Sequence, residues 1–181
     1  MTQHEYVFIA VSIILGLAIT RLLHAVAMLI RAHKQVKFHW STALWGLSIM
    51  AYVLQLWWIG WELRDLQVWT FTDFLVLIVG SICIYGAAEM ALPVPEAGSL
   101  DFLYHSERLG RLSALSMLFY FAIGPYVNLT MLSVPVPLFT ALIFPSIGIV
   151  LMLLIITLPR YFPWFSSVFA AYSLLILYLT A

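Results

Sequence analysis

Three ionisable side chains, Arg21, His24 and Glu89, fall inside long apolar segments, where a charge is costly and marks either chemistry or a buried partner. An Arg near the centre of a membrane helix costs about 2.5 to 3.5 kcal/mol on insertion scales. Arg21 and His24 are three residues apart and would share one helix face. At about 1.5 Å per residue, Arg21 and Glu89 would lie on the same side of the membrane midplane, about 5 Å and about 9 Å from it.

We therefore predict one intramembrane cluster, in which Arg21 pairs with Glu89 and His24 lies beside them. Two alternatives stay open: Arg21 could extend to the lipid headgroups, and Glu89 could lie at the end of its helix and face them. Such a cluster could act as a gate, an anion site or a proton relay, since a His balanced by a carboxylate can titrate near neutral pH.

Uncharged polar residues form stripes along two other apolar segments. Ser48, Tyr52 and Gln55 share one face of the segment 40–61, and Tyr120 and Asn128 share one face of the segment 112–133. Stripes of this kind usually form hydrogen bonds between helices. The alternative is that they line a hydrated path.

Prolines within two segments predict helix kinks. Gly124 and Pro125 lie in the segment 112–133, and Pro145 lies in the segment 138–158. Proline removes a backbone hydrogen bond and clashes with the preceding turn. Paired kinks are compatible with ordinary membrane helices or with the interrupted helices of transporters.

The sequence contains no recognisable catalytic or metal-binding pattern. No His is placed to activate Ser81, the five His residues lack metal-ligand spacing, and the single Cys83 excludes an internal disulfide. We expect no catalytic residue, no metal and no enzyme. No cofactor is implied, although Thr20, a small residue four positions before His24, leaves a pigment or haem at His24 as an option.

The amino-acid composition indicates that the chain is an integral membrane protein. Of 181 residues, 64% are apolar and only 16 are charged, 8 of each sign, and the mean hydropathy is +1.05. Too little polar surface is available to cover a globule in water. This composition excludes a soluble enzyme, a secreted disulfide scaffold, a disordered chain and a nucleic-acid-binding protein.

Six segments are long enough to cross a bilayer as helices, which predicts an all-α transmembrane bundle forming a single domain over residues 1–181. We expect the N-terminal segment to be a membrane helix rather than a secretory signal. For the last two spans, a re-entrant hairpin would also fit the joins. The predicted spans are 6–30, 40–61, 74–92, 112–133, 138–158 and 164–181.

Loop charges predict the orientation. Six basic residues fall in the first, third and fifth loops, whereas Arg64 alone falls in the second. The positive-inside rule then places both termini on the non-cytoplasmic side. The seven Trp residues are expected to anchor the spans at the membrane interfaces. The segment 101–111 is expected to form a short interfacial helix.

The stretch Ser12–Leu23 is followed by a basic loop, Trp40, Gln55–Trp58, Trp69–Phe71 and Leu92–Pro93. Over roughly the first half of the chain, this pattern resembles a group of small multi-pass membrane proteins encoded in bacterial genomes. The resemblance implies a protein of the bacterial inner membrane. It implies no activity and no site residue.

Three functions fit these observations. The first is a non-enzymatic scaffold, either an accessory subunit of a larger membrane complex or a self-associating bundle. The second is a small ion or solute channel or transporter that uses Arg21, His24 and Glu89. The third is a membrane protein that binds a cofactor, pigment or lipid. The expected partners are the bilayer and other membrane subunits or further copies of the chain, with no nucleic acid.

Overall fold

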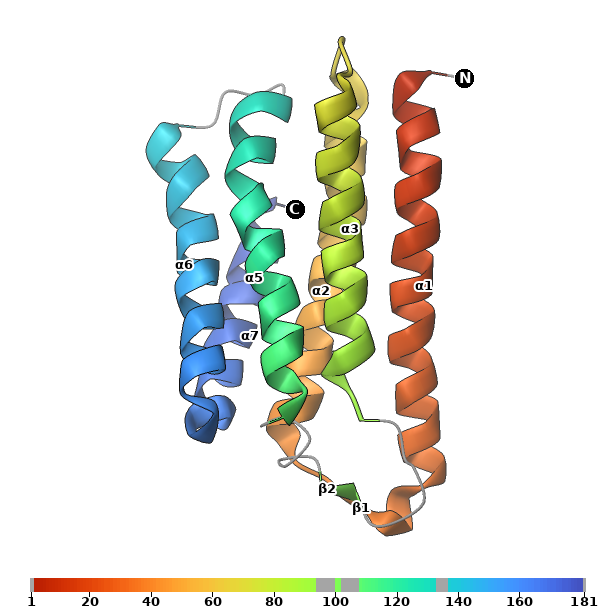
Figure 1. The fold of residues 1–181 in the computed structure, drawn as a ribbon, viewed down its shortest axis with the longest axis vertical. Helices are drawn as coiled ribbons and strands as arrows, with labels where there is room; N and C mark the ends of the chain where they lie inside the picture. The colour runs from red at the N-terminus through yellow and green to blue at the C-terminus, as the bar shows by residue number, and fades with distance from the viewer. Residues whose placement is uncertain (1, 94–99, 102–107, 133–136, 181) are drawn as a thin grey trace.

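A computed structural model shows six long helices running alternately up and down in one bundle (Figure 1). It describes residues 2–93, 100–101, 108–132 and 137–180. The helices are α1 (Gln3–Arg31), α2 (Trp40–Glu62), α3 (Phe71–Ala91), α5 (Gly110–Tyr126), α6 (Leu138–Thr157) and α7 (Phe162–Thr180). A π-helical segment, Val127–Met131, continues α5, and 3-10 turns at His33–Gln35, Leu63–Asp65 and Pro159–Tyr161 flank the other helices. Two-residue strands β1 (Val36–Lys37) and β2 (Leu100–Asp101) pair in parallel between the loops.

Reciprocal capping boxes define where two of the helices, α1 and α3, begin. The Thr2 hydroxyl accepts a hydrogen bond from the Glu5 backbone N–H, and the Glu5 carboxylate accepts one from the Thr2 backbone N–H. Thr70 and Asp73 form the same reciprocal capping box at the start of α3. These boxes satisfy backbone N–H groups that the first turn of a helix leaves without partners.

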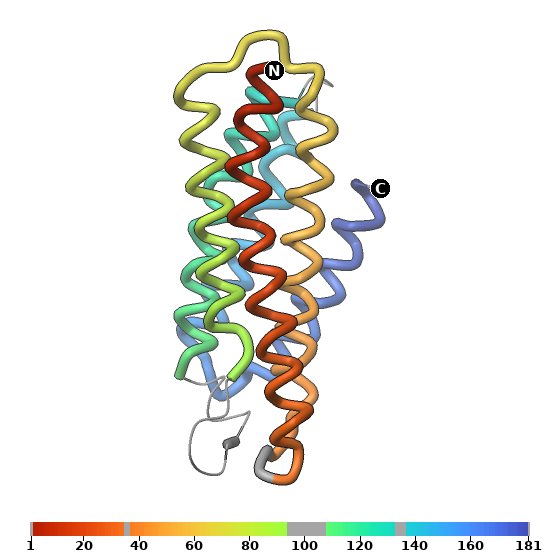
Figure 2. The backbone as a smooth tube through the Cα atoms, turned by 90° about the vertical axis from the view of Figure 1, so that its right-hand side faces the viewer, coloured from red at the N-terminus to blue at the C-terminus, as the bar shows by residue number. Residues whose placement is uncertain are grey.

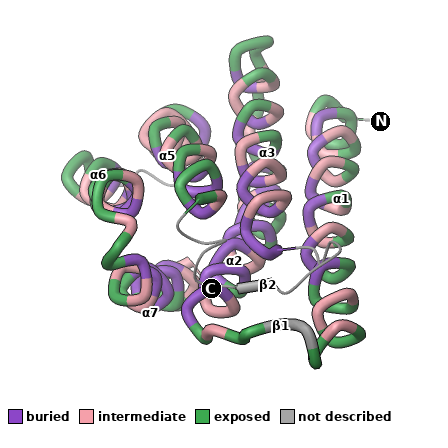
Figure 3. Tube along the Cα trace, turned by 60° about the horizontal axis from the view of Figure 1, so that its bottom comes forward, coloured by how far each residue is buried: buried purple, intermediate pink, exposed green. Residues whose placement is uncertain are grey.

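The helices form two layers. In Figure 3, α6, α5, α3 and α1 follow one another in one row, and α7 and α2 form a second row beside them. Buried residues face the space between neighbouring helices, and exposed residues lie on the outside. In Figure 2 the C-terminal half of α7 diverges from α2, which separates the two helices at the end of the bundle that carries both termini.

A polar chain ties three helices together at the buried centre. The Trp45 indole N–H on α2 donates to Ser113 Oγ on α5 over 3.0 Å, and the Ser113 hydroxyl donates to the Ala87 carbonyl on α3 over 2.8 Å. Trp45 is completely buried. The prediction that all seven Trp residues anchor the spans at the interfaces is therefore wrong for Trp45, because its indole N–H has a partner inside the bundle.

The prediction of six spans is confirmed. Within the described residues, six helices are long and apolar enough to cross a membrane, and the last two are full-length. Observed ends differ from the predicted ones by a few residues. The interfacial helix expected over 101–111 lies mostly outside the described residues, although Gly110 and Arg111 belong to α5. Which end of the bundle faces the cytoplasm stays a prediction.

Candidate functional site

A cavity of about 160 Å³ lies between the two layers, in the half of the bundle that carries the chain termini. All six helices except α1 contribute described residues to its lining. Apolar cavities of about 150 Å³ are large enough to hold a benzene-sized molecule. Six residues singled out in the sequence line it: Tyr52, Gln55, Tyr120, Gly124, Asn128 and Pro145.

The Tyr52 hydroxyl is buried and makes no hydrogen bond of good geometry to the described residues, although the Ser173 and Tyr172 hydroxyls are among its polar neighbours. Its ring is fixed on three sides, stacked on Phe169 with centroids 5.5 Å apart and meeting Phe121 and Tyr120 edge-on at 5.3 Å and 5.9 Å. The nearby Tyr172 hydroxyl donates to the Phe144 carbonyl over 2.6 Å instead. Burial of a hydroxyl without a partner costs free energy of folding. The Tyr52 hydroxyl is therefore able to form a further hydrogen bond to a molecule in the cavity.

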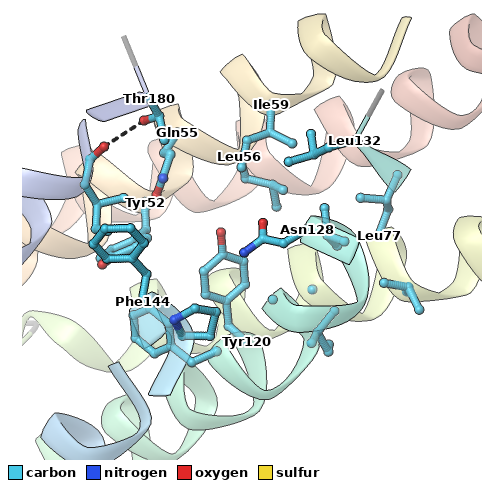
Figure 4. A pocket seen from close by; sticks show the side chains of 18 of the residues that line it. Tyr52, Gln55, Leu56, Ile59, Leu77, Tyr120, Asn128, Leu132, Phe144 and Thr180 are labelled. Atoms are coloured by element: carbon cyan, nitrogen blue, oxygen red, sulfur yellow. Dashed lines mark hydrogen bonds between the residues drawn. The ribbon is translucent and has the colours of Figure 1, made fainter. Parts of the chain in front are cut away.

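Gln55, one turn further along α2, adds a second unmet group. It is 7% exposed, lines the cavity, and makes no hydrogen bond to the residues that the structure describes. In Figure 4 its side chain lies at the cavity between Tyr52 and Thr180. A buried amide carries two N–H donors and one carbonyl acceptor. Gln55 and Tyr52 together offer several hydrogen bonds to whatever occupies the cavity.

The opposite wall is shaped by the passage from α-helix to π-helix after Pro125. Within this segment, the Leu132 N–H donates to the Val127 carbonyl, five residues back. Asn128 lies in the π-helical segment and donates its side-chain N–H to the Ala141 carbonyl on α6 over 3.2 Å. The ends of Tyr120 and Asn128 point to the same part of the cavity (Figure 4). Local π-helical turns are frequent at functional sites.

The predicted kink residues meet across α5 and α6. A Cβ added at Gly124 would lie 3.1 Å from the Pro145 ring, so the absence of a side chain lets the two helices approach closely beside the cavity. The π-helical segment begins directly after Tyr126, next to Pro125. By contrast, α6 stays an unbroken α-helix through Pro145. In the described residues, α6 is therefore not interrupted, and the pair of interrupted helices found in transporters is not formed by α5 and α6.

One further pair fixes the π-helical segment, and sequence reasoning did not single it out. The Tyr126 hydroxyl donates to the buried Asp73 carboxylate over 2.9 Å, and Thr70 donates to the same carboxylate over 2.7 Å. This contact joins the start of α3 to the end of α5. Its only sequence signal was a capping residue, Asp73, followed 53 positions later by a tyrosine.

The cavity adjoins a larger groove of about 770 Å³ at the end of the bundle. Both are lined by Glu62, Asn128 and Thr180, and the groove extends to Arg64 and Asp65. The cavity walls therefore change from uncharged at Tyr52 to charged at the mouth. A molecule could enter between α2, α6 and the end of α7.

Arg21 and Glu89 meet as an ion pair away from the cavity. Arg21 Nε lies 2.8 Å from Glu89 Oε2, which joins α1 to α3 as the depth argument predicted. The two side chains are 29% and 41% exposed. The pair therefore lies at the surface between two helices, not in the centre of the bundle.

His24 does not join this pair. Its side chain is exposed, and it makes no hydrogen bond or ion pair within the described part of the chain. The prediction that His24 joins the cluster is therefore wrong. Residues three positions apart differ by about 60° around a helix, so His24 can be exposed while Arg21 contacts α3. Ser48 also departs from the cavity, since its hydroxyl donates to the Leu44 carbonyl of its own helix.

Sequence reasoning missed the contribution of α7. Tyr172 and Thr180 line the cavity, as does Phe144 on α6. Periodicity alone could have placed Tyr172 and Thr180 on a polar face of the last span. Nothing in the sequence indicated that this face meets the Tyr52 stripe of α2.

Among the described residues, no three His, Cys, Asp or Glu side chains gather in an arrangement that could hold a metal ion. Comparison with known protein families, curated proteins and solved structures finds no match to this chain. Fold and site together define a multi-pass helical membrane protein with a mixed polar and apolar cavity between its two layers.

Proposed function

We propose that the protein is a non-enzymatic membrane protein that binds a small, uncharged, lipophilic molecule in the cavity lined by Tyr52 and Gln55. The observation that carries the proposal is a buried hydroxyl, that of Tyr52, and a side-chain amide, that of Gln55, which line a space of about 160 Å³ without a well-formed hydrogen bond to the described residues. A bound molecule would supply the missing hydrogen bonds and fill the apolar remainder. Following the sequence resemblance, we place the protein in the bacterial inner membrane.

The experiment compares two glycine variants by native mass spectrometry after gentle solubilisation. Gly80 lines the cavity, and its added Cβ would meet only Tyr120 at 3.9 Å, so Gly80→Leu is expected to fill the space. Gly16 has nothing within 4 Å of its added Cβ, which makes Gly16→Leu the matched control. We expect a small molecule bound at about one per chain in the wild type and in Gly16→Leu, and its loss in Gly80→Leu. Equal adducts in all three proteins, or none in the wild type, would contradict the proposal.

A second function is favoured by the surface position of Arg21 and Glu89. Partly exposed charges at membrane depth are stabilised when another protein covers them, which favours the scaffold function in a larger assembly. The same mass spectra test this idea: a fixed ratio of partner subunits or copies is expected, and Arg21→Leu combined with Glu89→Leu should release them. A wild-type chain that is always alone would exclude it.

Transport through Arg21, His24 and Glu89 gains no support from this arrangement. Arg21, His24 and Glu89 are not among the residues that line the cavity, and His24 stands apart from the ion pair. A pigment or haem at His24 likewise gains no support, since the His24 side chain is exposed and lines none of the cavities described above.

A further inference from the structure

We infer that the ligand is of the quinone type: a flat ring that bears carbonyl oxygens and carries hydrocarbon substituents. The inference rests on the proposed function of the cavity and specifies the chemical class that the cavity recognises. Three features of the lining carry it: its hydrogen-bond donors, its aromatic walls and its lack of charge at the inner end.

The inner end of the cavity presents donors. The Tyr52 hydroxyl is buried without a partner of good geometry, and the Gln55 amide and the Tyr120 hydroxyl line the cavity without a hydrogen bond to described residues. Hydroxyl and amide N–H groups donate to carbonyl oxygens. A simple hydrocarbon or an acyl chain has no acceptor to offer and would leave these donors unmet.

The walls are aromatic and fixed. Tyr52, Tyr120, Phe121, Phe144 and Tyr172 all line the cavity. Four of these rings are held by ring contacts with one another, with centroid distances from 5.3 to 6.2 Å. Aromatic faces and edges pack well against a second planar ring, which favours a flat ligand over a branched chain.

Charge is confined to the mouth. Glu62, at the end of α2, is the one carboxylate or basic side chain among the described lining residues. The lining also includes the uncharged Asn128 and Thr180 and the apolar Leu56, Ile59 and Ile176. A charged ligand would find no counter-charge beside Tyr52 and would lose its hydration. A neutral ring with its hydrocarbon part toward Ile59 and the bilayer matches this gradient.

The test uses two molecules of the same shape, duroquinone and durene, which are both tetramethylated six-membered rings and differ in the two carbonyl oxygens. Binding is titrated by calorimetry on the purified full-length protein in nanodiscs, and empty nanodiscs correct for partition into lipid. Each hydrogen bond of about 1 kcal/mol changes affinity about fivefold to tenfold. We expect duroquinone to bind at least about tenfold more tightly than durene.

Variants assign that preference to the donors. Tyr52→Phe and Gln55→Leu should each reduce duroquinone affinity about fivefold to tenfold and leave durene affinity unchanged. Ser48→Ala is the control, since Ser48 bonds within its own helix and lies outside the lining. Circular dichroism confirms that each variant keeps its helices.

Equal affinities for the two rings would overturn the carbonyl preference, while the proposed binding of a lipophilic molecule would stand. An equal loss of both rings in Tyr52→Phe would also overturn it, because shape rather than hydrogen bonding would then decide. Absence of saturable binding by either ring overturns the inference, and the native mass spectra decide the proposed function separately.

Discussion

Two tyrosine hydroxyls beside the cavity have opposite surroundings. Tyr172 donates to the Phe144 carbonyl over 2.6 Å, whereas Tyr52 is buried without a partner among the described residues. Removal of a satisfied hydroxyl loses a hydrogen bond, and removal of an unsatisfied one relieves a desolvation cost. The two residues therefore allow a matched test of the site.

We predict that Tyr172→Phe lowers the free energy of unfolding by about 1 kcal/mol, while Tyr52→Phe leaves it unchanged or raises it by up to about 1 kcal/mol in ligand-free protein. The measurement is reversible unfolding in mixed micelles. A loss of about 1 kcal/mol or more in Tyr52→Phe would mean that its hydroxyl has a protein partner, and the cavity would lose its main polar group.

The ion pair between Arg21 and Glu89 supports a second prediction at residue scale. Arg21→Glu and Glu89→Arg should each reduce the amount of folded protein in the membrane, because each puts two like charges where Arg21 Nε and Glu89 Oε2 now lie 2.8 Å apart. The double exchange should restore much of the loss. Losses that simply add in the double variant would show that the two side chains act independently.

How far the sequence predicted the site depends on the residue. The position of each residue along its helix was enough to pair Arg21 with Glu89, because the rise per residue puts both at a similar depth in the membrane. The same logic failed for His24, since a spacing of three residues fixes a face only to within tens of degrees. Tyr52 and Gln55 were recognised as polar, but their lack of partners depends on how α2, α5 and α7 pack, which no local pattern encodes.

At the scale of elements, α5 and α6 pack closely because of a glycine. A Cβ added at Gly148 would lie 2.6 Å from the Phe121 ring, which is itself wedged against Tyr52 and Phe169. The sequence does not indicate that Gly148 contacts Phe121, since Gly148 is one of nine glycines. The helices themselves, by contrast, follow directly from apolar segment length.

Gly148→Ala is therefore expected to destabilise the protein by about 1 to 3 kcal/mol, the usual cost of overpacking a core. Gly16→Ala, where nothing lies within 4 Å of the added Cβ, should be neutral or slightly stabilising. Unfolding in mixed micelles measures both. Similar effects of the two substitutions would contradict the close packing of Phe121 on α6.

At the scale of the whole molecule, the basic residues gather at one end of the bundle. Arg31 ends α1, Arg111 lies in the first turn of α5 and Arg160 precedes α7, whereas Arg64 lies at the opposite end with the cavity mouth. By the positive-inside rule, we predict that the cavity mouth faces away from the cytoplasm.

Cysteine labelling of intact spheroplasts tests this orientation. In a Cys83→Ser background, Gln67→Cys between α2 and α3 should react with a membrane-impermeant maleimide, and Lys34→Cys should react only after lysis. Both positions are exposed. The reverse pattern would place the cavity mouth at the cytoplasmic side and would show that loop charge does not decide the topology here.

The central claim, that the cavity between Tyr52 and Asn128 is a ligand site, is tested most directly by a high-resolution electron cryomicroscopy map of the protein purified from its own membrane. The account predicts continuous density for one small molecule within hydrogen-bonding distance of the Tyr52 hydroxyl and the Gln55 amide, and none in Gly80→Leu. Density for ordered water alone at these groups, or a collapsed cavity in which Tyr52 and Gln55 bond to protein, would contradict it.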